Sequence, residues 1–305
     1  MKKKGSLTQE IWKARYLYLC LLPLFVWLVI FQYGPMYGIV LAFKKYSARL
    51  GILGSEWVGL SNFKRIFITP VAVKAIANTL RISVGRLAFE FPMGIIVAIL
   101  LSEMPGKRGK KAVQTVLTFP HFLSWVVVAS ILRNFLGSGG VINELLSGVG
   151  IGTVNFLGNE SLFRPLLYAT ANWKEMGWSA IIYMAAIAGI DPTLYEAAEC
   201  DGASRLKRIW HITLPGIRGT VAIMFILAVG GIMSAGFDQI FNLNNAMVEG
   251  SARILDIYVY DLTFRSVPDY GFTTAVGMFT AVINLFMLLG ANQVVYKLTG
   301  DKMFS

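Results

Sequence analysis

Six long apolar segments constrain the fold of this chain more than any other feature of its sequence. About 20 apolar residues in a helix are enough to cross the ~30 Å hydrocarbon core of a bilayer. Charged residues make up 15% of the 305-residue chain, whereas a soluble domain carries about 25%. The sequence therefore predicts an all-α membrane protein with six transmembrane helices, at residues 16–42, 77–101, 113–136, 163–190, 219–241 and 272–296.

The first apolar segment follows a basic N-terminus, MKKKGSLTQEIWKAR, and this arrangement is also typical of a cleaved signal peptide. The apolar run is too long for the core of a signal peptide. No small-residue cleavage site follows it, because residues 32–35 read QYGP. We therefore interpret residues 16–42 as a retained first span.

The distribution of basic residues predicts the orientation of the chain. With six spans both termini lie on one side, and the short segments on that side carry 15 Lys and Arg residues. The segments on the other side carry nine, six of them in residues 43–76. The positive-inside rule then places residues 1–15, residues 297–305 and the loop 191–219 in the cytoplasm. The net charge of +11 needs no nucleic-acid partner to explain it.

The loop 191–219 has the pattern of a short helical hairpin. Residues 196–199, EAAE, favour a helix, and Gly202 permits a turn with positive φ. A second helical run is expected from Ala203 to about Trp210. We expect Pro215 to prevent a simple continuation, since proline cannot donate a backbone hydrogen bond. A helical hairpin between two spans is an unusual insertion, and we interpret it as a docking surface for a soluble partner.

Several polar residues lie inside the predicted spans, where charged groups are costly and normally face a cavity or a partner. Arg86 and Glu90 are four residues apart and share a helix face. A Lys–Glu pair lies near the middle of the fourth span between two tryptophans, whose faces can stack on sugar rings. The candidates for a translocation pathway are Asn172, Trp173, Lys174, Glu175, Trp178, Arg86, Glu90 and Arg133. The alternative is a network of structural ion pairs, with Arg133 extending to the membrane surface.

Four further polar residues have less distinctive positions. We interpret His121 as a satisfied bundle histidine and Asn284 as a contact between helices. Asp238 and Gln239 end the fifth span and are interpreted as a hydrated rim.

The sequence lacks several common catalytic and nucleotide-binding motifs. It holds no phosphate-binding loop, no zinc-protease motif, no serine-hydrolase motif and only two histidines, His121 and His211. We therefore expect neither an enzyme nor a metal site, and no cofactor in this chain. If the chain performs active transport, the energy must come from another subunit.

Residues 196–217, EAAECDGASRLKRIWHITLPGI, resemble the EAA loop of binding-protein-dependent ABC importer permeases. The matching positions are Glu196, Ala197, Ala198, Asp201, Gly202, Ala203, Leu214 and Pro215. Residues 57–63, 119–129 and 173–198 also resemble a carbohydrate branch of this family that handles complex oligosaccharides, including uronate-containing ones. Gly219 departs from the pattern, because relatives often carry proline there.

The resemblance implies a type I ABC importer permease fold with a cytoplasmic coupling helix, in one transmembrane domain over residues 16–296 of a bacterial cell-membrane protein. It also implies a second permease, a cytoplasmic ATPase dimer that holds ATP and Mg, an extracellular solute-binding protein and an oligosaccharide substrate. The alternatives are a sugar-specific secondary transporter, which would need an internal ion site and an inverted repeat, or a channel without ATP coupling.

Overall fold

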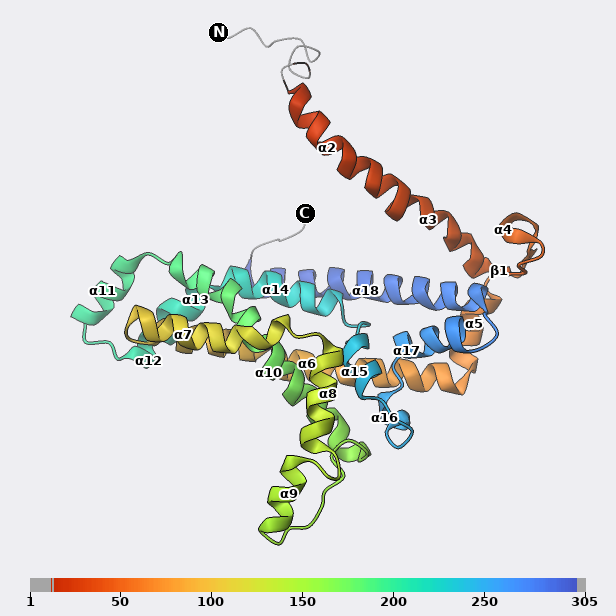
Figure 1. The fold of residues 1–305 in the computed structure, drawn as a ribbon. Helices are drawn as coiled ribbons and strands as arrows, with labels where there is room; N and C mark the ends of the chain where they lie inside the picture. The colour runs from red at the N-terminus through yellow and green to blue at the C-terminus, as the bar shows by residue number, and fades with distance from the viewer. Residues whose placement is uncertain (1–11, 13, 301–305) are drawn as a thin grey trace. The chain divides into compact units, whose positions relative to one another are not determined.

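A computed structural model describes residue 12 and residues 14–300, and these are almost entirely helical (Figure 1). The basic MKKK start and residues 301–305, which contribute to the predicted orientation, lie outside the described residues. The chain divides into two compact units. The first holds Met1–Ile68 and Leu262–Phe279, and the second holds Thr69–Asp261 and Thr280–Ser305.

The first unit begins with the first predicted span. Helix α2 (Arg15–Leu28), a π-helical turn (Val29–Tyr33), α3 (Gly34–Met36) and a 3₁₀ segment (Tyr37–Phe43) together form a helical span of 29 residues. Its most apolar stretch buries none of its side chains. A long apolar helix whose side chains are exposed is suited to contact lipid or another subunit.

The rest of the first unit is a small polar assembly. Strand β1 (Lys44–Lys45) pairs antiparallel with β2 (Glu56–Trp57), and helix α4 (Gly51–Gly54) lies between them in sequence. Helix α5 (Ser61–Ile68) follows, where the sequence indicated a short amphipathic helix. The buried Asn62 amide donates to the carbonyls of Ala42 and Lys44 at 3.0 and 3.1 Å, which fixes α5 against the end of the span.

Two parallel helices, α6 (Pro70–Glu103) and α10 (Glu160–Ala188), form the centre of the second unit. Between them in sequence come α7 (Lys107–Thr118), α8 (Trp125–Leu136) and α9 (Val141–Gly148). After the hairpin follow α14 (Arg218–Gly230), α15 (Phe237–Leu243), α16 (Glu249–Ala252), α17 (Leu255–Tyr260), a π-helical turn (Asp261–Arg265) and α18 (Tyr270–Thr299). From residue 280 onward α18 packs on α14 through Leu288, Ala291 and Val295.

The prediction of six uninterrupted spans is not confirmed. Four helical stretches among the described residues are long and apolar enough to cross a membrane: Arg15–Phe43, Pro70–Glu103, Trp125–Gly148 and Tyr270–Leu298. A fifth is a pair bent by 62°, Arg205–Gly216 with Arg218–Gly230. Helix α10 has 29 residues but is not among them, because Lys174, Glu175 and nearby polar residues lower its hydropathy.

Two of the predicted spans are broken. The segment 113–136 ends its first helix at Thr118, because Pro120 cannot continue the hydrogen-bonding pattern and Ser124 caps a new helix by accepting from Val127 N at 3.3 Å. The segment 219–241 stops at Gly230, and α15 starts only at Phe237. In the first break the Lys174 ammonium on α10 donates to the His121 carbonyl at 2.7 Å. In the second, Met233 N donates to Asn284 Oδ1 on α18 at 3.0 Å, which confirms the predicted contact between helices at Asn284.

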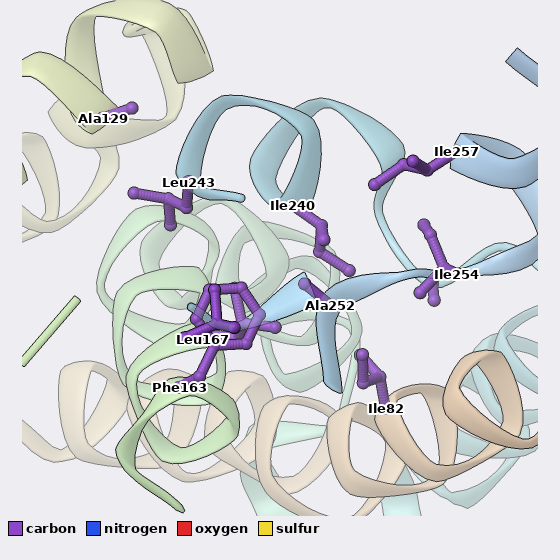
Figure 2. Close-up of a cluster of buried hydrophobic side chains, with 11 residues drawn as sticks. Ile82, Ala129, Phe163, Leu167, Ile240, Leu243, Ala252, Ile254 and Ile257 are labelled. Atoms are coloured by element: carbon purple, nitrogen blue, oxygen red, sulfur yellow. The ribbon is translucent and has the colours of Figure 1, made fainter. Parts of the chain in front are cut away.

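A buried apolar cluster joins six helices of the second unit (Figure 2). Ile82 comes from α6 and Phe163 and Leu167 from α10, while Ile240 from α15 and Ile257 from α17 approach from the other side. All are 0–2% exposed. Burial of apolar surface stabilises a fold by about 25 cal/mol per Å². This packing therefore orders helices α15 to α17, which are too short to be stable alone.

Gly177 allows the closest approach between α10 and α7. A Cβ atom at this position would lie 2.2 Å from the carbonyl oxygen of Leu117, which is backbone and cannot rotate away. We expect Gly177→Ala to destabilise the protein by about 2 kcal/mol through overpacking. Thermal unfolding of the purified protein measures this. Gly109→Ala in α7 is the matched control, because nothing lies within 4 Å of its Cβ position, and there the helix should become slightly more stable.

Candidate functional site

A cavity of about 280 Å³ lies between α6, α10, α14 and the turn that follows α14. Its polar lining comes from Ser83, Arg86 and Glu90 on α6, and from Asn172 and Glu175 on α10. Phe91, Met176, Tyr183 and Leu227 contribute apolar surface. An apolar wall with a few convergent polar groups is typical of a small-molecule site.

Arg86 is held between α6 and α15. Its Nε lies 3.6 Å from Glu90 Oε1, which confirms the predicted pairing of these two residues. Its Nη2 donates to Gln239 Oε1. Gln239 in turn donates to the Leu167 carbonyl at 2.9 Å and to Thr170 Oγ1 at 2.8 Å, both on α10. The prediction of a hydrated rim at Gln239 is therefore wrong: the side chain is 0% exposed, because the break after Gly230 turns α15 back into the core.

Lys174 and Glu175 hold the break in the third predicted span. Lys174 is 5% exposed. Its ammonium donates to the His121 carbonyl at 2.7 Å and to Glu175 Oε1 at 3.1 Å. Glu175 Oε2 lies 2.7 Å from His121 Nδ1, so the carboxylate contacts both Lys174 and the imidazole. The imidazole stacks on Trp178 with ring centroids 4.2 Å apart and planes 2° from parallel. The predicted Lys–Glu pair is real, and it fixes the break between α7 and α8.

Four predicted pathway residues are not part of the cavity lining: Trp173, Lys174, Trp178 and Arg133. Trp173 is 42% exposed and is not part of the lining, because consecutive helical residues are about 100° apart and Trp173 points away from Glu175's side of α10. Arg133 is exposed and donates to the Asn242 carbonyl, which links α8 to α15. It contributes to packing rather than to the cavity wall.

Four of the residues around the cavity carry a buried polar atom without a hydrogen-bond partner: Ser83 Oγ, Arg86 Nε, Glu90 Oε1 and Asn172 Oδ1. Buried polar atoms in folded proteins are nearly always bonded. Each one left unsatisfied costs about 1–3 kcal/mol. Their concentration around one cavity indicates a place where a hydroxyl-rich ligand, or a rearrangement of the helices, completes the bonding.

The loop 191–219 forms the predicted helical hairpin. Helix α11 (Pro192–Cys200) starts at Asp191, whose carboxylate accepts from Thr193 N at 3.0 Å, and this bond lowers the pKa of Asp191. Gly202 has φ +72°, and Ser204 caps the second helix, α12 (Arg205–Arg208). An ion pair between Glu199 and Arg208 joins the two arms.

The second arm continues further than predicted. A π-helical turn (Ile209–Thr213) and α13 (Leu214–Gly216) carry the helix through Pro215, and the sharp bend follows at Ile217. Wider π-helical turns move the carbonyl that would clash with a proline ring. The second arm, predicted to end near Trp210, therefore runs to Gly216, and the interruption expected at Pro215 comes two residues later.

One surface of the hairpin is apolar and exposed. Leu194 is 52% exposed, Leu206 65% and Trp210 62%. Glu196, Ala197, Asp201 and Pro215 are also exposed, whereas Ala198, Ala203 and Leu214 are half-buried. A pocket of about 400 Å³ opens between the arms at Ala198, Ala203 and Ile212. Exposed large apolar side chains that share a surface with charged ones are typical of a protein-binding surface.

Residues 90–298 match the family model described as "Binding-protein-dependent transport system inner membrane component". The chain belongs to this family. It is 43% identical to the polygalacturonan/rhamnogalacturonan transport system permease protein YteP of Bacillus subtilis (strain 168), over 97% of this chain and 92% of that protein. It is 39% identical to Protein LplB of the same organism, over 96% and 92% of the two chains.

Solved structures agree with this assignment. A chain in the crystal structure of a bacterial ABC transporter involved in the import of the acidic polysaccharide alginate is 38% identical, with a TM-score of 0.88 over 96% of this chain and 99% of that one. A second structure, of the bacterial alginate ABC transporter in complex with alginate pentasaccharide-bound periplasmic protein, gives 37% identity and the same TM-score. The permease therefore has the type I ABC importer fold and is a multi-pass membrane protein.

The roles of His121 and Gln239 in this permease go beyond what the sequence predicted. His121 follows Pro120, and a proline–histidine pair inside an apolar segment signals a break whose backbone needs partners. Gln239 carries no local signal, because its partners Arg86 and Leu167 are 153 and 72 residues away. Within the described part of the chain, no group of three or more His, Cys, Asp or Glu side chains could hold a metal ion.

Proposed function

We propose that this permease forms, with a second permease, the translocation pathway of an ATP-driven importer for an acidic oligosaccharide delivered by an extracellular binding protein. The cavity between α6, α10 and α14 is its part of the pathway. The observation that carries this proposal is the set of four buried polar atoms around that cavity that make no hydrogen bond, two of which, Arg86 Nε and Glu90 Oε1, are held only by their ion pair at 3.6 Å. Sugar hydroxyls donate and accept at once, so they can satisfy both carbonyl oxygens and N–H groups.

Size and charge define what this cavity can contribute. About 280 Å³ is at the lower end of ligand pockets, so a longer oligosaccharide needs surface from the second permease as well. Arg86 is paired with Glu90, and Glu175 is paired with Lys174. The cavity therefore offers no free cation to a uronate carboxylate, and we propose that it recognises sugar hydroxyls.

The hairpin supplies the coupling in this proposal. Glu196, Ala197, Ala198, Asp201, Gly202, Ala203, Leu214 and Pro215 form the surface that docks on a cytoplasmic ATPase, one of a dimer that binds ATP and Mg. Both termini then lie in the cytoplasm. Six crossings result if α10 and the bent segment before and after Ile217 each count as one.

Asn172→Leu tests the cavity, because leucine has nearly the same volume as asparagine but cannot bond a hydroxyl. We expect uptake of the oligosaccharide to fall about tenfold, the loss expected for one hydrogen bond to a buried group. ATPase activity of the assembled transporter without substrate should be unchanged. Radiolabelled uptake into proteoliposomes loaded with ATP measures this. Asn134→Leu, on the exposed side of α8, is the matched control.

Two outcomes would contradict the proposal. Equal uptake by Asn172→Leu and Asn134→Leu would remove the cavity from the pathway. Uptake that collapses with an ion gradient and ignores ATP would instead indicate a secondary transporter.

A further inference from the structure

A second polar pocket lies at the other end of the α6–α10 pair from the hairpin. It has a volume of about 370 Å³ and is formed by α6, the start of α10 and α16. Lys74, Arg81 and Arg164 line it, and only Glu160 among its lining residues is acidic. We refer to these three basic residues as the cation cluster. From Arg164 to Ala188 the helix rises about 36 Å, so the cation cluster and the hairpin belong to opposite membrane surfaces.

The members of the cation cluster form no ion pair with a described carboxylate. Ion pairs hold Arg65, Arg86, Lys174, Arg208 and Arg253, but among the described residues none involves Lys74, Arg81 or Arg164. Three cations share this pocket with a single carboxylate, Glu160, so they repel each other at a cost that a bound anion reduces. The pocket is therefore electrostatically suited to an anion.

The cation cluster is built on a fixed support. Arg164 Nη2 donates to Asn78 Oδ1 at 3.0 Å, and Asn78 is 1% exposed. The Asn78 amide also donates to the carbonyls of Gly250 and Arg253 at 3.0 and 3.1 Å. One buried side chain thus connects α6, α10 and the chain around α16, and it holds the Arg164 guanidinium in place before any ligand arrives.

The helix face beneath the cation cluster is apolar and exposed. Ala88, Pro92 and Ile96 follow Arg81 at spacings of seven, eleven and fifteen residues, so they continue the same stripe of α6. Phe89 beside this stripe is 58% exposed and Leu100 63%. Arg81 and Leu100 are separated by about 28 Å of helix, close to the ~30 Å hydrocarbon thickness. Cations therefore lie at headgroup depth above a face that suits acyl chains.

The same geometry argues against a sugar carboxylate in this pocket. Glu90, which lines the central cavity, comes nine residues after Arg81 and therefore about 180° round the helix. Lys74 and Arg81 therefore lie on the side of α6 opposite the central cavity, and a saccharide moving through the cavity would not pass them.

We propose that the cation cluster binds the phosphate of an anionic phospholipid, whose acyl chains lie along Ala88, Pro92 and Ile96. Three donors from two helices, one of them the fixed guanidinium of Arg164, suit the oxygens of a phosphate diester. The lipid then fills the groove between the start of α10 and α6 in the leaflet opposite the hairpin. This proposal does not depend on the transported substrate.

Native mass spectrometry of the assembled transporter tests the lipid site. The complex is taken from vesicles of phosphatidylcholine with phosphatidylglycerol, and the phospholipid it retains is counted. We expect the double variant Lys74→Gln with Arg81→Gln to retain phosphatidylglycerol about tenfold less, since each surface cation strengthens anionic-lipid binding several-fold. Retention of phosphatidylcholine should not change. Both side chains are exposed, so the fold should tolerate the change.

The matched control is the double variant Arg49→Gln with Lys64→Gln, which removes two exposed cations from the first unit. Equal retention of phosphatidylglycerol by the two double variants and the unmodified chain would overturn the proposal. Equal losses in both would also overturn it, because they would indicate charge alone. Displacement of the lipid by a uronate oligosaccharide, or a crosslink from position 81 to a partner subunit, would assign the cation cluster to that ligand instead. Lipid retention without sugar uptake would count against the proposed function only.

Discussion

Gly202→Val should abolish oligosaccharide uptake while leaving the permease inserted in the membrane. Gly202 has φ +72°, a conformation that costs an L-residue about 1–2 kcal/mol, and a β-branched side chain is the least tolerant of it. The hairpin has few tertiary contacts to resist the strain, so the turn between α11 and α12 should open. We expect the ATPase subunit to be lost on purification and ATP-driven uptake to fall at least tenfold.

The same loop offers a matched control for this turn. Gly219 also has nothing within 4 Å of its Cβ position, but its φ is not in the left-handed region, so Gly219→Val removes a glycine without straining the backbone. Co-purification of the ATPase with each variant, followed by uptake, gives the comparison. If Gly202→Val keeps both the ATPase and transport, the hairpin is not the coupling element.

The hairpin could be predicted from sequence because its determinants are local. Helix-forming residues at 196–199, a capping Asp191 and a glycine at the turn specify the first arm within a dozen residues. Only the end of the second arm was misplaced, since Pro215 is compatible with a helix when a π-helical turn precedes it. Local signals of this kind do not depend on the rest of the fold.

The cavity was predictable in part. Arg86 and Glu90 are paired by their spacing on one helix, and neighbouring charges identified Lys174 and Glu175. The wall opposite them depends on where α14 stops and how α15 returns, which is decided by contacts with residues far away in sequence. Burial of Gln239 against Leu167 is such a contact, so the sequence near position 239 looked like a polar end of a span.

The breaks in the predicted spans also depend on contacts between residues far apart in the sequence. A break inside an apolar segment exposes backbone carbonyls and N–H groups that lipid cannot satisfy. Pro120 marked the position, but only the structure shows that Lys174 donates to the freed His121 carbonyl. The buried ammonium therefore substitutes for the missing helical hydrogen bond, and Glu175 neutralises it.

This role makes Lys174→Met the substitution with the largest expected effect on stability. Methionine fills the space of the lysine stem, but the His121 carbonyl loses its donor and Glu175 loses its cation. Removing one member of a buried pair costs about 3–5 kcal/mol, and we expect about 3 kcal/mol because Glu175 is one-third exposed. Thermal unfolding of the purified permease measures the loss, and the exposed Lys107→Met is the control.

A double variant separates charge pairing from the backbone contact. Adding Glu175→Gln to Lys174→Met replaces the carboxylate that had lost its counter-ion with a neutral amide. Part of the stability lost in Lys174→Met should therefore return. The stability that does not return is the contribution of the hydrogen bond from Lys174 to the His121 carbonyl. Full additivity of the two substitutions would mean that the pair does not act as a unit. In that case Lys174 would hold the break between α7 and α8 through the His121 carbonyl alone.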